Sequence, residues 1–139
     1  MNGTKLNPAL LATLLAGEHK ANGAPFTVVS NATGRDYTFK LNRAQYKNKW
    51  YSHVMVEVEY LKFKYLGFFT GSSIIHKKMA NESPAAVAAT WLLKRIVTGG
   101  DLSEVTIYHT GRCLKCGREL TDASSIERGI GPTCALKLN

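Results

Sequence analysis

The stretch YTFKLNRAQYKNKWYSHVMVEVEYLKFKY, residues 37–65, decides the fold. Apolar and polar residues alternate over 37–41 and again over 50–59. A period of two is typical of a strand that buries one of its faces. The polar and basic segment 42–49 between the two runs predicts a loop. We therefore predict two neighbouring strands of an antiparallel sheet, connected through that loop.

The alternation changes phase near Tyr60. Val54, Val56 and Val58 occupy even positions, whereas Phe63 and Tyr65 occupy odd ones. A shift of one residue moves every side chain to the other face of a sheet. The sequence therefore predicts a β-bulge or a tight reversal close to Tyr60, with further β structure over 68–75.

A helix is predicted over 84–98. Ser83 is a favourable N-cap residue, Pro84 suits the first turn, and the segment after it is rich in alanine. Short strands are expected over 26–29 and 105–108. Together these segments favour an α+β fold, in which a small antiparallel β-sheet is packed by one main helix.

Residues 1–24 are expected to form an N-terminal arm and linker outside the 25–108 core. Asn7 and Pro8 predict a short helix over 9–16, while 18–24 shows no periodicity. We expect this arm to be docked on the core or partly mobile.

The composition fits one globular domain. The chain has 139 residues, 45% of them apolar and 20% charged, which argues against wholesale disorder. No apolar run approaches the roughly 20 residues of a membrane helix, and the N-terminus makes a poor secretion signal. We therefore expect no membrane association, and a location in the cytoplasm of the cell or, for a phage protein, of its host.

Basic residues are concentrated in the middle of the chain. The formal net charge is +8, and residues 35–78 hold nine Lys and Arg against three Asp and Glu. A local basic field attracts polyanions such as nucleic acid or acidic protein surfaces.

Three cysteines lie in the last 27 residues, and an odd number argues against a disulfide scaffold. The pair Cys113-x2-Cys116 and the later Cys134 suit Zn²⁺, which takes four N or S ligands. His109, at the end of a predicted strand, is our expected fourth ligand, with Asp122 as a weaker candidate. Four protein ligands close a site to water, so the 109–139 module is predicted to be a structural zinc knuckle.

No catalytic motif is recognisable. A zinc deaminase needs His-x-Glu before Pro-Cys-x2-Cys, which is absent, as are a phosphate-binding loop and a serine elbow. We predict a protein that is not an enzyme and has no small-molecule substrate.

The string HTGRCLKCGRELTDASSIERGIGPTC, residues 109–134, resembles a C-terminal cysteine motif of small phage and bacterial proteins. The region before it is similar too, with a Thr33-Gly34 turn and a Tyr65-Leu66-Gly67 element ahead of a proline-started helix. The chain departs from those proteins at 59–62, where they often have a Gly-, Pro- or Asp-rich turn. The resemblance implies a phage or prophage origin and bound zinc, and it implies no particular activity.

Cations and aromatic rings interleave in the basic middle, as in surfaces that follow phosphates and stack on bases. Strand alternation offers the other interpretation, with the rings in the core and the lysines in water. The candidate binding residues are Lys40, Arg43, Lys47, Lys49, Trp50, Tyr51, Lys62 and Lys64. We expect a nucleic-acid-binding protein. The alternative is a protein-binding phage effector that inhibits a host or anti-phage defence enzyme.

Overall fold

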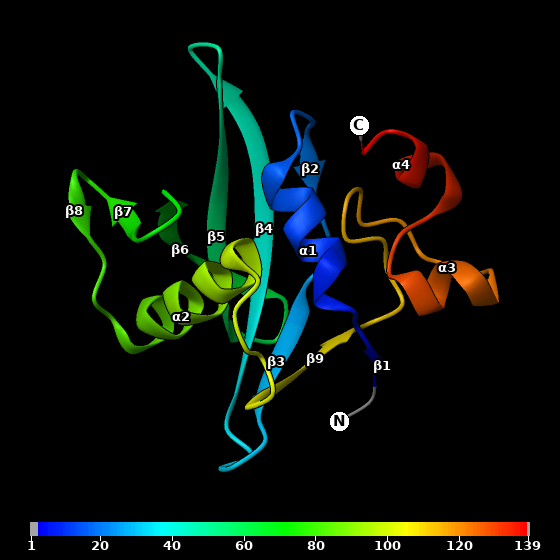
Figure 1. The fold of residues 1–139 in the computed structure, drawn as a ribbon, viewed down its shortest axis with the longest axis horizontal. Helices are drawn as coiled ribbons and strands as arrows, with labels where there is room; N and C mark the ends of the chain where they lie inside the picture. The colour runs from blue at the N-terminus through cyan, green and yellow to red at the C-terminus, as the bar shows by residue number, and fades with distance from the viewer. Residues whose placement is uncertain (1–2, 139) are drawn as a thin grey trace.

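The computed structural model describes residues 3–138, which form a large antiparallel sheet and several short helices (Figure 1). The strands are β1 (Thr4–Lys5), β2 (Ala21–Asn22), β3 (Phe26–Ser30), β4 (Asp36–Tyr46), β5 (Lys49–Glu59), β6 (Lys62–Phe69), β7 (Ile74–His76), β8 (Met79–Ala80) and β9 (Val105–His109). The helices are α1 (Pro8–Ala16), α2 (Pro84–Thr98), α3 (Ala123–Arg128) and α4 (Pro132–Leu136). The α+β expectation is confirmed in outline, and the predicted 84–98 helix is present as α2, accompanied by several shorter helices. None of the described helices is long and apolar enough to cross a membrane.

The strand order is β1-β9-β3-β4-β5-β6-β7-β8, and β2 also pairs with β4. Neighbouring strands are antiparallel throughout. The last strand, β9, lies between β1 and β3, although it follows α2 in the chain. This insertion carries the cysteine-rich tail to the edge of the sheet where the N-terminal residues also lie.

The predicted loop over 42–49 is wrong, because β4 and β5 continue through it as one long hairpin. Asn42 pairs with His53, and Tyr46 pairs with Lys49 at the tip. Lys47 and Asn48 have positive φ angles of 50° and 64°, the conformation of a two-residue turn that matches strand twist. Pairing across the hairpin overrides the low strand preference of these polar residues.

The predicted reversal near Tyr60 is confirmed. β5 ends at Glu59 and β6 begins at Lys62, so Tyr60 and Leu61 form the turn. Leu61 has a φ of 59°, and its N–H donates to the Glu57 carboxylate at 3.1 Å. That hydrogen bond helps to hold a turn that lacks the usual Gly or Asn.

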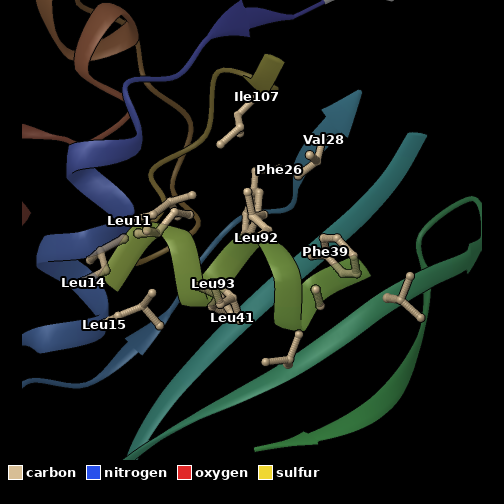
Figure 2. Packing of buried hydrophobic residues seen from close by; sticks show 14 of the residues in the cluster. Leu11, Leu14, Leu15, Phe26, Val28, Phe39, Leu41, Leu92, Leu93 and Ile107 are labelled. Atoms are coloured by element: carbon tan, nitrogen blue, oxygen red, sulfur yellow. The ribbon is translucent and has the colours of Figure 1, made fainter. Parts of the chain in front are cut away.

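The hydrophobic core lies between one face of the sheet and the two longer helices. Figure 2 shows the leucines of α1 and α2 meeting the aromatic rings of β3 and β4. The predicted start of each helix is confirmed: the Asn7 side chain accepts the Ala9 N–H, and the Ser83 side chain accepts the Ala86 N–H. Fully buried members include Leu11, Phe26, Phe39, Leu92 and Leu93.

The N-terminal segment is docked on the core, which agrees with one of the two alternatives expected for the arm. Leu6, Leu11, Leu14 and Leu15 are buried in the same cluster as α2 and the sheet. The 15-residue helix α2 leaves part of the sheet uncovered. The apolar face of α1 covers that part, beside α2.

Candidate metal centre and open sheet face

The cysteine module begins with a tight reversal that brings Cys113 and Cys116 together. The Gly117 N–H donates to the Cys113 carbonyl at 2.8 Å, and the Cys113 N–H donates to the Arg118 carbonyl at 2.8 Å. Gly117 has a φ of 79°, a conformation that side chains disfavour. This glycine therefore allows the chain to fold back directly after the second cysteine.

Cys134 is delivered to this turn by two short helices. The Asp122 carboxylate caps α3, Gly129 ends it with a φ of 79°, and α4 starts at Pro132. Cys134 lies in α4. The Leu114 N–H donates to the Gly129 carbonyl at 3.0 Å, which ties the helical half to the cysteine turn.

The structure brings the three predicted cysteine ligands together. Their Sγ atoms all lie within 4.8 Å of one another, and they form the one such group found within residues 3–138. Tetrahedral zinc with Zn–S bonds of about 2.3 Å needs sulfurs about 3.8 Å apart. Cys113 is buried, Cys134 is half-buried and Cys116 is exposed, so the group lies at the surface of the module.

The surroundings of Cys113 and Cys134 shift the pKa values of these two thiols in opposite directions. Burial raises the pKa of the Cys113 thiol, but backbone N–H groups that donate to its sulfur bring that pKa below its ordinary value. Those groups belong to Gly131, Cys116 and Lys115. Burial, followed by the neighbouring sulfurs, raises the pKa of Cys134 to about 12. A divalent cation between the sulfurs would remove this mutual repulsion and favour the thiolate form of all three. The donor set therefore fits a thiophilic metal ion such as Zn²⁺.

His109 lies outside the group of three sulfurs. Its ring is completely buried, and Nδ1 accepts the Gly111 N–H at 3.0 Å. Nε2 is buried without a hydrogen-bond partner among the described residues. Burial lowers the pKa of His109, an effect that the backbone of Ile126 partly opposes. The structure thus does not bring His109 to the sulfurs, and its role as fourth ligand stays a prediction.

Asp122, the weaker candidate, lines the same cavity of about 280 Å³ as the three cysteines. One of its oxygens, Oδ2, accepts the Ser124 hydroxyl at 2.8 Å and the Ser125 N–H at 3.2 Å. Hydrogen bonds from these two serines lower the pKa of Asp122 and keep it ionised. The carboxylate is therefore fixed beside the metal centre as the N-cap of α3.

Residues 20–24 dock directly on the cysteine turn, an interaction that the sequence did not predict. The Asn22 N–H donates to the Lys115 carbonyl at 2.9 Å, and the Ala24 N–H donates to the Cys113 carbonyl at 3.2 Å. Between them, Gly23 lies so close to Leu114 that no side chain would fit. Gly23 was the sequence signal that could have indicated this contact, because glycine often occurs where two backbone segments approach closely.

A second candidate site lies on the face of the sheet that points away from α1 and α2. Residues that alternate with the core positions of β4, β5 and β6 occupy this open sheet face. We define its aromatic row as Tyr51, His53, Phe63, Tyr65 and Phe68, with Lys40 and Met55 beside it. The side chains are half-exposed, and Tyr65 is 37% exposed.

The rings of the row contact one another across the strands. Tyr51 and Phe68 meet edge to face, with centroids 5.3 Å apart. The His53 Nδ1 and the Tyr65 hydroxyl are 2.8 Å apart, and Lys40 Nζ lies 5.9 Å from the Phe63 ring centre. Burial lowers the pKa of His53, so this ring is neutral at pH 7. The open sheet face thus presents uncharged rings with a cation at their side.

The predicted binding residues do not share one face. Lys40 and Tyr51 lie on the open sheet face, while Lys47 and Lys49 lie at the exposed β4–β5 tip. Trp50 has the parity of the core residues and therefore lies on the helix side. Lys64 pairs with Val56 and has the same parity, and Lys62 forms an ion pair with Glu59 at 3.2 Å.

Arg43, another predicted binding residue, has a structural role. Its Nε donates to the Gly17 carbonyl at 2.6 Å, and its Nη1 donates to the Ser52 hydroxyl at 2.8 Å. These bonds attach the end of α1 to β4 and β5. The guanidinium therefore secures α1 to the sheet and faces away from the open side. Of the aromatic row, Tyr51 alone was among the predicted binding residues. The other rings were missed because they share one face with it only once the hairpins are paired.

The C-terminal module matches a described family. The sequence model of a family of unknown function, DUF6011, matches residues 105–139, about a quarter of the chain. No curated protein and no solved structure was found to match. The family match covers β9 and all three cysteines, so the similarity lies in the candidate metal centre and leaves most of the sheet outside it.

Proposed function

We propose that this protein binds one zinc ion through Cys113, Cys116 and Cys134. The observation that supports the proposal is the convergence of three sulfurs, one of which receives backbone N–H groups that lower the pKa of its thiol. When bound, the ion supplies cross-linking between the cysteine turn and α4. The module then stays in place against residues 22–24, because the Asn22 and Ala24 N–H groups donate backbone hydrogen bonds to it.

We infer a non-catalytic role in nucleic-acid binding for the sheet that this module supports. The observation that supports this role is the aromatic row on the open sheet face. Lys40 lies at the side of the row, and the basic β4–β5 tip lies beyond one of its ends. Exposed rings on an antiparallel sheet stack on bases, while lysines neutralise phosphates. Two acidic groups lie near the row: Glu59 forms an ion pair with Lys62, and Glu57, which pairs with Phe63, accepts the Leu61 N–H.

Salt-dependent binding tests this function. The Lys47→Asn/Lys49→Gln variant removes two cations at the β4–β5 tip, and asparagine tolerates the positive φ at position 47. Each lost phosphate contact should reduce the slope of log affinity against log salt by roughly 0.7 to 0.9. Fluorescence anisotropy with labelled oligonucleotides measures this slope. Lys94→Gln, which removes an exposed cation from α2, is the control and should change it little.

Absence of binding at low salt would refute the nucleic-acid proposal, because electrostatic attraction is strongest there. A discrete complex of fixed stoichiometry with one host protein, together with that absence, would favour the protein-binding effector.

A further inference from the structure

We infer that the aromatic row binds single-stranded nucleic acid in preference to duplex, with successive bases stacked on its rings. This inference rests on the nucleic-acid function proposed above and specifies its ligand. It places the binding surface on the open sheet face, whereas the candidate residues predicted from the sequence lie on both faces of the sheet.

The spacing of the rings suits an extended strand. Phe63 and Tyr65 lie two residues apart on β6, so their Cα atoms are separated by about 6.7 Å. Tyr51 and Phe68 lie further along the same face and meet edge to face. Several rings are thus offered in sequence along neighbouring strands, as required for more than one stacked base.

The chemistry of these rings favours unpaired bases. A ring stacks on the flat face of a base, which is free in a single strand and covered by neighbouring bases within a duplex. The row offers few hydrogen-bonding groups, because the Tyr65 hydroxyl and the His53 Nδ1 are already 2.8 Å apart. Recognition by stacking alone predicts tolerance of base identity.

Charge at the row complements a phosphate backbone. Lys40 Nζ lies over the Phe63 ring. A base that stacked on this ring would displace the Lys40 ammonium group toward the phosphate next to that base. The cations of the β4–β5 tip extend the basic surface beyond Tyr51, which pairs with Ala44 near that end. A row of uncharged rings beside cations matches a polyanion with exposed aromatic bases better than it matches an acidic protein.

The test compares a labelled 15-nucleotide oligothymidine with a 15-base-pair duplex, using the full metal-loaded chain and anisotropy. We expect the single strand to bind at least about tenfold more tightly. Phe63→Leu and Tyr65→Leu should each weaken that binding by at least about fivefold. Tyr60→Leu, which removes an 85% exposed ring from the β5–β6 turn, is the matched control and should stay within about twofold.

A cross-linking experiment on the unaltered chain avoids any folding defect of the variants. Photo-cross-linking of an iodouridine oligonucleotide should join it to peptides containing Phe63, Tyr65 or Tyr51. Cross-links confined to α2 would overturn the inference. Equal affinity for single strand and duplex, unaffected by either leucine variant, would also overturn it while leaving nucleic-acid binding intact. No binding of either oligonucleotide at low salt would overturn the proposed function as well.

Discussion

Gly23→Ala tests the contact between the N-terminal segment and the cysteine turn. A Cβ at this position would lie 1.7 Å from the Leu114 carbonyl oxygen and 2.5 Å from its carbon. Both partners are backbone atoms, so no side-chain rotation relieves the overlap. Residues 22–24 and 113–115 must therefore move apart by more than about 1 Å, since contacts below 3.0 Å are essentially never found.

The magnitude follows from the bonds that such a displacement breaks. The Asn22 N–H and Ala24 N–H bonds to the cysteine turn, at 2.9 and 3.2 Å, flank the contact on both sides. Each is worth about 0.5–1.5 kcal/mol, and forcing extra volume into a packed site costs about 1–3 kcal/mol. We expect a loss of roughly 2–6 kcal/mol in the free energy of unfolding, and a fall of roughly 7–20 °C in Tm.

Thermal melting of the zinc-loaded chain, followed by circular dichroism, measures the loss. Gly131→Ala is the matched control, because its Cβ would lie 3.7 Å from a Leu120 methyl group, an ordinary contact. It should lower Tm by no more than about 2–3 °C. If the Gly23→Ala chain had the same Tm as the parent, residues 20–24 would not dock on the cysteine turn.

Two further predictions concern histidines. His109→Ala should lower the free energy of unfolding by about 2–4 kcal/mol, because it leaves a cavity and an unpaired Gly111 N–H. Metal analysis of the same variant tests the predicted role of His109 as fourth ligand: weakened zinc retention would support that role, and retention as tight as in the parent would contradict it. Burial holds the pKa of His19, His53 and His109 below the ordinary 6.5, so the unfolded chain takes up protons first as pH falls. Stability should therefore be full above about pH 7 and decline from there toward pH 5. Chemical denaturation at both pH values should show a smaller decline for His53→Gln than for the parent; an equal decline would contradict the assignment to His53.

Much of the sheet could be predicted from its periodicity, and the failures have physical causes. The strand alternation and the caps of α1 and α2 are local properties, so they were visible at Asn7 and Ser83. The 42–49 segment looked like a loop because its residues are polar and basic. Its strand structure comes from pairing across the hairpin, with Lys47 and Asn48 in left-handed conformations that their residue types do not require.

Part of the candidate site could likewise be predicted from the sequence, and part could not. The cysteine spacing predicted the sulfur cluster, because Gly117 and Gly129 mark the turns that bring the ligands together. The surroundings of His109 depend on packing between β9 and residues distant in sequence, such as Leu6 beside Gly129. The side of the sheet that each cation occupies could not be predicted from the sequence either, because it follows from strand register and from the long-range hydrogen bonds of Arg43.

Zinc stoichiometry tests the central claim most directly. Native mass spectrometry of the full chain, purified without added chelator, should show one zinc ion per chain. Cys134→Ser should lose that ion, and Ser124→Ala, which removes a hydrogen bond to Asp122 but no sulfur, should retain it. Loss of zinc should also lower Tm, because the binding energy of a structural ion is folding energy. A parent chain that is folded, metal-free and unchanged in Tm by a strong chelator would contradict the account.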